Sequence, residues 1–512
     1  MRPAIALAFL LAVGAAVQLE GQCPDGSPPP CARAAAAPTP GANSVGVMLF
    51  NNLTRDTAYA YLSDGLASEI ATSLARVPRL EVRSPGAVRS AQRGVDPDPR
   101  LIGRRLNVRY VVEGDFQRGG ERIRISVRLV VLPSGTQRWS EGYTRPVTDL
   151  LAVQEEIASA VATAIAGALL PKERTVLAQR PTQDPEAYDH FLRGNFQLAR
   201  RTPSSVARAI EEYGIALRLD PSFAQANARV ALGYALYLDW GWNFPGVTPD
   251  SQLVVGLRAA DRALAMDSSS ADGWIARAYF LSFRNPRTLE GVIDALERAT
   301  QLDPRSAEAW HQYGSWLAVF GRLDESITGL RRALALEPGR AVTLFTLGQV
   351  YEVIRRDTEA LQSYDSAIVA DPEFYAAYSF RTFVRLRARD LAGARADAEA
   401  ATRFSPMGEE YYGLAPLAAV TAFEGDTAAA RRLMERALEP IADGTPGLLV
   451  GQMIGLGLLS TGERRQALDV LERTAAHGVI LWYSLQLPAF DPLRNEPRFQ
   501  RLNDESRPPG AR

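Results

Sequence analysis

The pattern of hydrophobic and polar positions changes near residue 180. Before that point, a short apolar run at 45–50 and the segments 80–83, 109–116 and 137–143 are typical of strands, and 122–132 alternates apolar with polar side chains. Segments 64–74, 98–106 and 147–170 carry apolar side chains at helical spacing. This order predicts one compact α/β domain over residues 44–180.

After residue 184 the pattern is helical and repeats itself. Pro304, Pro338, Pro372 and Pro406 follow one another at intervals of 34 residues. That interval is the period of the tetratricopeptide repeat (TPR), in which two antiparallel helices form one unit. We predict a TPR solenoid of about eight units over 184–475, with a longer inter-helix loop at 239–250 and a capping segment and tail at 476–512.

The interior of one repeat, 341–372, agrees with this assignment. Gly348 and Ala360 are small where the two helices cross, and Tyr351 and Tyr364 fill the gap between them. Pro372 cannot continue the second helix, so it forces the turn into the next unit. One repeat later, Arg381 stands at a position that is usually apolar.

The α/β segment resembles a known bacterial domain. Residues 47–52, 61–66, 103–106, 110–114, 135–136 and 139–141 match, in order and spacing, the TolB-like N-terminal domain that precedes repeat arrays in many bacterial proteins. The expected fold class is therefore α+β/α: a small TolB-like α/β domain followed by an all-α TPR superhelical solenoid. Members of that family often carry a kinase, cyclase or DNA-binding domain upstream. Here a targeting signal is expected in that place, so the resemblance implies no such activity.

The N-terminus carries that expected signal. Arg2 precedes an apolar run of 14 residues at 4–17, shorter than the ~20 that a spanning helix needs, and small residues follow. We interpret residues 1–22 as a secretory signal peptide, with an uncleaved N-terminal anchor as the alternative. Residues 23–43 are rich in Pro and Ala and predict a flexible linker. The expected location is periplasmic or envelope-associated, with membrane association through the N-terminus as an open alternative.

The two cysteines, Cys23 and Cys31, lie just after this signal. Three interpretations stay open: a small disulfide loop in an oxidising compartment, lipidation of Cys23, or a pair without a role in a disordered leader. The residues before Cys23 fit a lipidation signal poorly, because Glu20 and Gln22 stand where an apolar and a small residue are expected.

Composition and motifs argue against nucleic-acid binding and catalysis. The chain has 57 basic and 58 acidic side chains, and phosphate binding needs a basic surface. His190, His311 and His477 lie far apart in sequence, and no metal-binding, phosphate-binding or nucleophile motif occurs. The adjacent pair Glu409 and Glu410 is expected on a solvated face. We therefore predict a protein without enzymatic activity or cofactor.

The expected functional surface is the concave face of the solenoid, which the first helix of each unit lines. Aromatic side chains at successive units there suit a peptide or helix of a partner protein. The leading hypothesis is a non-enzymatic scaffold of the bacterial cell envelope; the alternative is a sensory or accessory subunit whose α/β domain binds a small ligand and signals through the repeats. The candidate groove residues are Tyr279, Phe283, His311, Ser315, Phe345, Gln349, Glu352, Phe383 and Arg387.

Overall fold

The structure is a computed structural model. It describes residues 39–508 except 55, 95–97, 241, 243, 245, 285–289, 407–408, 440–447 and 477–481. The expected signal peptide, Cys23, Cys31, most of the expected linker and His477 lie outside the described residues, as does the side chain of Phe283. Contacts divide the chain into residues 1–40 and 41–512, and the second unit is described below.

A mixed sheet opens this unit. Its strand order is β3-β1-β4-β5-β6, and β2 pairs with β4 off this path. The parallel pairs are β1 with β3, β1 with β4 and β2 with β4, and the rest of the sheet is an antiparallel meander from β4 to β6. Gly120 (φ +62°) and Gly135 (φ +74°) supply the left-handed backbone at its two turns. The strands are β1 (Ser44–Val47), β2 (Asn51–Asn52), β3 (Glu81–Val82), β4 (Tyr110–Gly119), β5 (Arg122–Val131) and β6 (Thr136–Pro146).

Helices cover both faces of this sheet. On one face, α1 (Ala60–Ala75) and α4 (Leu150–Ala166) pack against alternate strand residues such as Ile125 and Val127. On the other, α2 (Pro85–Gln92) and α3 (Pro99–Leu106) share a smaller core with Val111. Helix α5 (Pro171–Leu177) follows α4. The predicted α/β fold of this segment is confirmed, as a small mixed-sheet domain over about residues 44–146. Helix α2 was not predicted from the hydrophobic pattern; Ser84 caps its first turn by accepting from the Ala87 amide.

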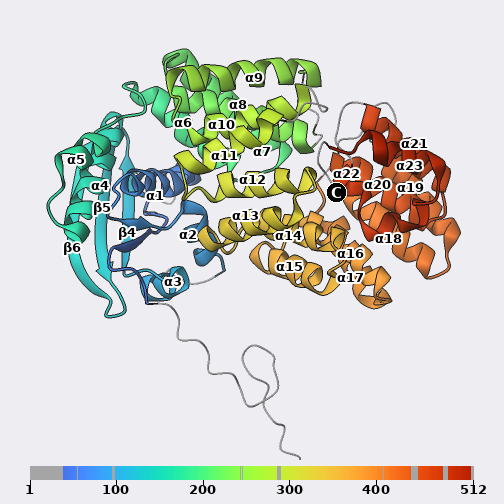
Figure 1. Ribbon diagram of the computed structural model, residues 1–512. Coiled ribbons are helices and arrows are strands. Elements are labelled where there is room, and N and C mark those ends of the chain that lie inside the picture. The colour runs from blue at the N-terminus through green and yellow to red at the C-terminus, as the bar shows by residue number, and fades with distance from the viewer. Residues whose placement is uncertain are drawn as a thin grey trace, which may run out of the picture. The chain divides into compact units, whose positions relative to one another are not determined.

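The rest of the described chain is a helical repeat array, as predicted (Figure 1). Eight helix pairs follow one another within the described residues, and α22 (Trp482–Leu485), the 3₁₀ helix η4 (Pro488–Leu493) and α23 (Pro497–Glu505) come after them. The pairs are α6 (Pro185–Leu198) with α7 (Pro203–Leu219), α8 (Ala224–Trp240) with α9 (Pro249–Met266), α10 (Ala271–Arg284) with α11 (Glu290–Leu302), α12 (Ala307–Val319) with α13 (Leu323–Leu336), α14 (Ala341–Val353) with α15 (Asp357–Ala370), α16 (Tyr375–Arg387) with α17 (Leu391–Phe404), α18 (Tyr411–Phe423) with α19 (Thr427–Leu438) and α20 (Leu448–Ser460) with α21 (Arg464–Ala476).

In two of these pairs, a small residue on the first helix faces a large one on the second. A Cβ atom on Gly348 of α14 would lie 2.6 Å from Cε1 of Tyr364 on α15. The equivalent distance from Gly194 of α6 to Cε1 of Tyr213 on α7 is 2.4 Å. Both tyrosines are fully buried, so the ring occupies the volume that the glycine leaves open. This contact therefore sets the distance between the two helices of each of these pairs.

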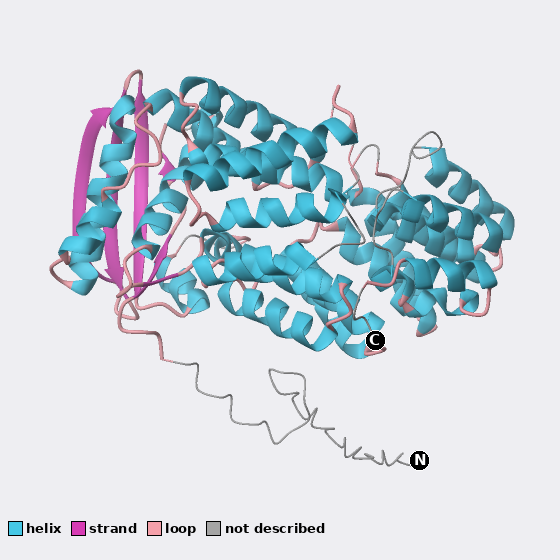
Figure 2. Cartoon of the chain, turned by 45° about the horizontal axis from the view of Figure 1, so that its top comes forward, coloured by secondary structure: helices cyan, strands magenta, loops and turns pink. Residues whose placement is uncertain are grey.

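One hydrophobic core joins the sheet to the first repeats. It runs from Val45 through α1 and α4 into α6–α11 and ends at Ala309 of α12. Polar contacts reinforce the junction: the guanidinium of Arg305 donates to the carbonyls of Leu80, at 2.9 Å, and Ala75. Separating the α/β domain from the repeats would expose this core to water. The array is shown by secondary structure in Figure 2.

We predict opposite effects for two helical glycine substitutions. Gly348→Ala places a methyl group against the Tyr364 ring and should lower the free energy of unfolding by about 1–3 kcal/mol. The matched control Gly214→Ala lies inside α7 with only the flexible end of Arg218 within 4 Å, at 3.7 Å. It should stabilise the protein by about 0.5–1 kcal/mol through helix propensity. Urea unfolding followed by circular dichroism measures both; a neutral Gly348→Ala would contradict the packing account.

Candidate functional site

The first helices of successive pairs line a cavity of about 800 Å³, which we call the groove. Helix α2 of the α/β domain and α22 near the C-terminus contribute to the same lining. The groove is therefore built from three parts of the sequence that lie far apart. Its lining includes Arg89, Ser90, Arg93, Arg200, Arg201, Leu236, Leu238, Tyr279, Ser282, His311, Gln312, Ser315, Trp316, Glu337, Arg340, Val342, Phe345, Thr346, Gln349, Asp371, Glu373, Phe374, Tyr375, Arg403, Phe404, Gln452, Tyr483 and Ser484.

Five of the residues expected in the groove line it: Tyr279, His311, Ser315, Phe345 and Gln349. Their exposure is low. The ring of Phe345 is 3% exposed because it packs edge-on against Phe374 and Phe380, with centroids 5.6 and 5.1 Å away. Half-buried aromatic rings that the sequence analysis did not select, those of Trp316, Phe374, Tyr375 and Phe404, offer more of their surface to the groove.

The other three described candidates lie behind this lining. Phe383 is 4% exposed and belongs to the core of the second half of the array. Arg387 donates to Glu352 at 2.8 Å and to Asp357 at 2.9 Å, and Tyr364 donates to Glu352 at 3.0 Å. Burial raises the pKa of the Glu352 carboxyl, and the Arg387 guanidinium offsets part of that rise. This ion pair ties α14 to α16 and stabilises the register of two first helices.

A buried polar cluster supports the groove around His311. Thr343 Oγ1 lies 3.2 Å from His311 Nδ1, and Arg201 donates to Glu308 at 3.0 Å. Arg340 bridges Glu308 and Glu337. Burial, with a further contribution from Arg340, lowers the pKa of His311 to about 3, so the imidazole is neutral near pH 7. A neutral, hydrogen-bonded imidazole presents a polar but uncharged surface to the groove.

Helix α2 enters the groove by crossing the turns of two successive repeats. Ser90 Oγ donates to the Gly339 carbonyl at 3.2 Å, in the turn after α13. Arg93 donates to the Ala370 carbonyl at the end of α15, and its guanidinium lies 3.9 Å from the Asp371 carboxylate. These contacts join residues about 250–280 positions apart in the sequence. The periodicity of either segment therefore could not predict that α2 contacts the repeats.

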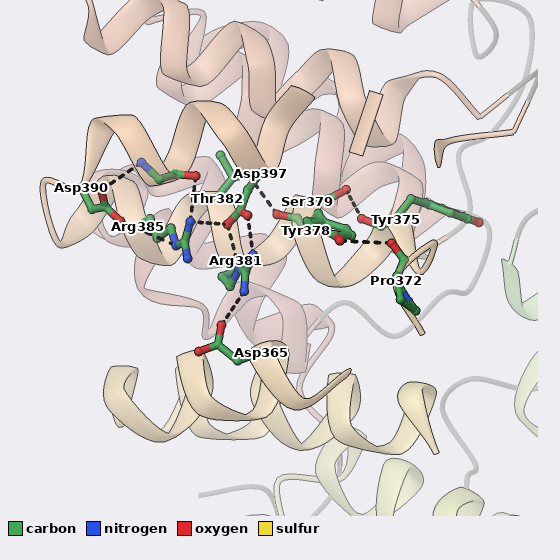
Figure 3. Close-up of polar contacts among 11 residues, drawn as sticks. Asp365, Pro372, Tyr375, Tyr378, Ser379, Arg381, Thr382, Arg385, Asp390 and Asp397 are labelled. Atoms are coloured by element: carbon green, nitrogen blue, oxygen red, sulfur yellow. Dashed lines mark hydrogen bonds and ion pairs between the residues drawn. The ribbon is translucent and has the colours of Figure 1, made fainter. Parts of the chain in front are cut away.

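The unusual Arg381 of α16 forms a buried ion-pair cluster (Figure 3). Its guanidinium donates to both carboxylate oxygens of Asp397, at 2.8 and 2.5 Å, and to Asp365. Arg385 lies 3.3 Å from the same Asp397 carboxylate. Burial raises the pKa of this carboxyl, although both arginines act to lower it. Because Asp397 is 2% exposed and does not line the groove, this cluster stabilises the core of the repeat.

The expectation that Glu409 and Glu410 form a solvated face is wrong for Glu409. Its side chain is 4% exposed and accepts from the Tyr375 hydroxyl at 2.6 Å. Burial raises the pKa of Glu409 to about 7, and hydrogen bonds from Tyr375 and Trp242 offset part of that rise. The Glu409 carboxylate lies in the packed junction between α16 and α18, which the sequence alone did not show.

Among residues that the structure describes, no group of three or more His, Cys, Asp or Glu side chains has a metal-binding arrangement. In the same part of the chain, no helix combines the length and the apolar character needed to cross a bilayer.

Comparison with characterised sequences finds partial relatives, and no family model matches the chain. The chain is 32% identical over 256 residues to "Putative adenylate cyclase 3" of Rhizobium meliloti (strain 1021), which covers 50% of this chain and 43% of that protein. It is 33% identical over 150 residues to protein FlbA of Caulobacter vibrioides, covering 29% of this chain and 24% of FlbA. The chain thus spans less than half the length of the curated relatives it matches.

Solved structures of smaller proteins align with parts of this chain. PilF of Pseudomonas aeruginosa aligns with 48% of this chain and 98% of its own, at 17% identity and a TM-score of 0.36. A thermophilic TPR protein of Thermus thermophilus aligns with 39% of this chain and 99% of its own, at 20% identity and a TM-score of 0.33. These similarities concern the fold alone.

The Arg381 cluster yields a double-mutant prediction. Arg381→Leu introduces the residue found 34 positions earlier, Leu347, but leaves the Asp397 carboxylate buried without its bidentate partner. We expect a loss of up to about 3–5 kcal/mol in the free energy of unfolding, because Arg385, 3.3 Å away, still compensates part of the Asp397 charge. Adding Asp397→Ser, which copies Ser363 of the preceding repeat, should restore most of it.

The control for this prediction is Arg395→Leu. Its ion pair with Glu424 is about one-third exposed on both sides and should contribute less than about 1 kcal/mol. Urea-unfolding midpoints of the four proteins provide the comparison. A double variant no more stable than Arg381→Leu alone would show that the cluster does not act through charge compensation.

Proposed function

We propose that this protein is a non-enzymatic scaffold that binds a peptide or helix of a partner protein in the groove. The observation that carries the proposal is the continuity of the groove along the first helices α8, α10, α12 and α14. Its lining includes both half-buried aromatic rings and neutral polar side chains. Such a surface offers apolar area together with hydrogen-bond partners, the combination used for recognising short protein segments.

The location and the domain assignment extend this proposal. A secretory signal or anchor at 1–22, a flexible linker at 23–43 and a TolB-like domain at 44–180 would place the groove in the cell envelope, with residues 184–475 as the TPR solenoid and 476–512 as its cap. The sequence resemblance and the apolar run at 4–17 support this part. The α/β domain then has a definite task, because α2 forms one wall of the groove.

The name "Putative adenylate cyclase 3" is that of the Rhizobium relative, of which this chain spans 43%. The polar clusters described above are instead closed ion pairs: Glu352 with Arg387, Asp397 with Arg381, and Glu308 with Arg340. Such pairs fix helices relative to one another. They support a role as a binding framework.

Site-specific photo-crosslinking in cells tests the proposal. A photoreactive residue at Thr346, which lines the groove, should give a discrete adduct with a partner protein. The same residue at Val369, which is 82% exposed on α15, should not. The full chain must be used, since a cut at residue 184 would open the core shared with the α/β domain.

A variant pair completes this test. Trp316→Ala with Phe404→Ala removes two half-buried rings of the groove and should weaken partner binding about tenfold or more, because aromatic anchors dominate such interfaces. Phe423→Ala, which removes a 44% exposed ring outside the groove, should leave binding unchanged. Equal crosslinking from positions 346 and 369, or equal loss in both variants, would refute the groove as the binding site.

A further inference from the structure

The charge of the groove differs in sign from that of the whole chain. Among the residues that the structure describes, its lining carries six arginines and three acidic side chains, whereas the chain has a formal net charge of −1. The groove is therefore a basic surface on a protein that is slightly acidic. A concave site lined by one sign of charge attracts segments of the opposite sign.

Four of the six arginines are already compensated within the protein. Arg89 donates to Asp64 at 2.7 Å, Arg93 faces Asp371, and Arg201 and Arg340 bind Glu308. These four hold α2 and the first helices in place. Their pairing lowers the charge available to a ligand.

The two remaining arginines are exposed. Arg200 follows α6, and its guanidinium carbon lies 5.6 Å from the ring centroid of Phe196. Arg403 lies in the last turn of α17, and its guanidinium carbon lies 5.9 Å from the ring centroid of Phe404. Among the residues that the structure describes, neither guanidinium has a carboxylate within ion-pair distance. Among the described carboxylates of the lining, Glu373 is the one that is likewise exposed and forms no ion pair. The uncompensated charge of the lining is therefore positive.

We propose that the groove selects an acidic segment of the partner, with Arg200 and Arg403 binding its carboxylates. Arginine presents planar donors that match a carboxylate in two parallel hydrogen bonds. The rings of Phe374 and Phe404 accept apolar side chains of the same segment, so the occupant is an acidic peptide with interspersed apolar residues. This inference rests on the proposed function and adds the chemical class of the partner.

Unbiased peptide selection tests it. A library of random twelve-residue peptides is selected on the immobilised full chain, and the enriched sequences should carry more Asp and Glu than the starting library. A labelled peptide from this selection, measured by fluorescence anisotropy, should bind the variant Arg200→Glu with Arg403→Glu about tenfold or more weakly. Its affinity for the unaltered protein should fall as salt rises from about 50 to about 300 mM, because salt screens such contacts.

The matched control is Arg208→Glu with Arg298→Glu. These exposed arginines lie on the second helices α7 and α11, outside the groove, so their reversal changes net charge equally and should leave peptide affinity within about twofold. Equal weakening in both double variants would mean a general charge effect and overturn the inference. Melting temperatures of both variants exclude unfolding as the cause.

Other outcomes separate this inference from the proposed function. Enriched peptides without acidic bias that still crosslink to position 346 would leave the groove as the binding site and overturn the acidic preference. Acidic peptides that bind the Arg200 and Arg403 variant as tightly as the original would overturn it as well. Failure of the library to yield any enriched peptide would also overturn it, since it requires a linear acidic segment to bind.

Discussion

The close approach of two helices at a glycine determines much of this structure. Where Gly348 and Gly194 leave space, the rings of Tyr364 and Tyr213 fill it, so in these two pairs the helices lie at a fixed short distance. Repetition of helix pairs places the first helices side by side. The groove is the surface that these helices leave uncovered, and its dimensions follow from packing inside the pairs.

Within a few turns of one first helix, some side chains pack in the core and others line the groove. Phe345 lines the groove, yet its ring packs mainly against Phe374 and Phe380. Glu352 lies behind the lining and forms an ion pair with Arg387. Substituting such residues would test stability as much as binding. The half-buried rings of Trp316 and Phe404 separate the two roles better, because more of their surface faces the groove.

The sequence predicted what local patterns determine. Short strand-like segments and the alternation at 122–132 predicted five of the six described strands, with β2 missed, and the 34-residue period predicted the helical array. Both signals depend on residues close in sequence. Contacts between distant segments were missed: α2 reaches the turns at Gly339 and Ala370, and α22 contributes to the groove. The prediction that Glu409 is solvated was wrong for the same reason. Its hydrogen-bond partner in the buried state, the Tyr375 hydroxyl, lies 34 positions away in the sequence. Of the candidate site, the lining by first helices was predictable, whereas the arginines that follow α6 and end α17 were not.

The central claim is that α2 and the first helices together form the binding surface. Hydrogen–deuterium exchange of the full chain, alone and with the partner recovered by crosslinking, tests this most directly. We predict slower exchange on binding in α2, α12 and α14, the elements that line the groove. Slower exchange confined to second helices such as α13 and α15, or to the sheet edge at β6, would contradict it.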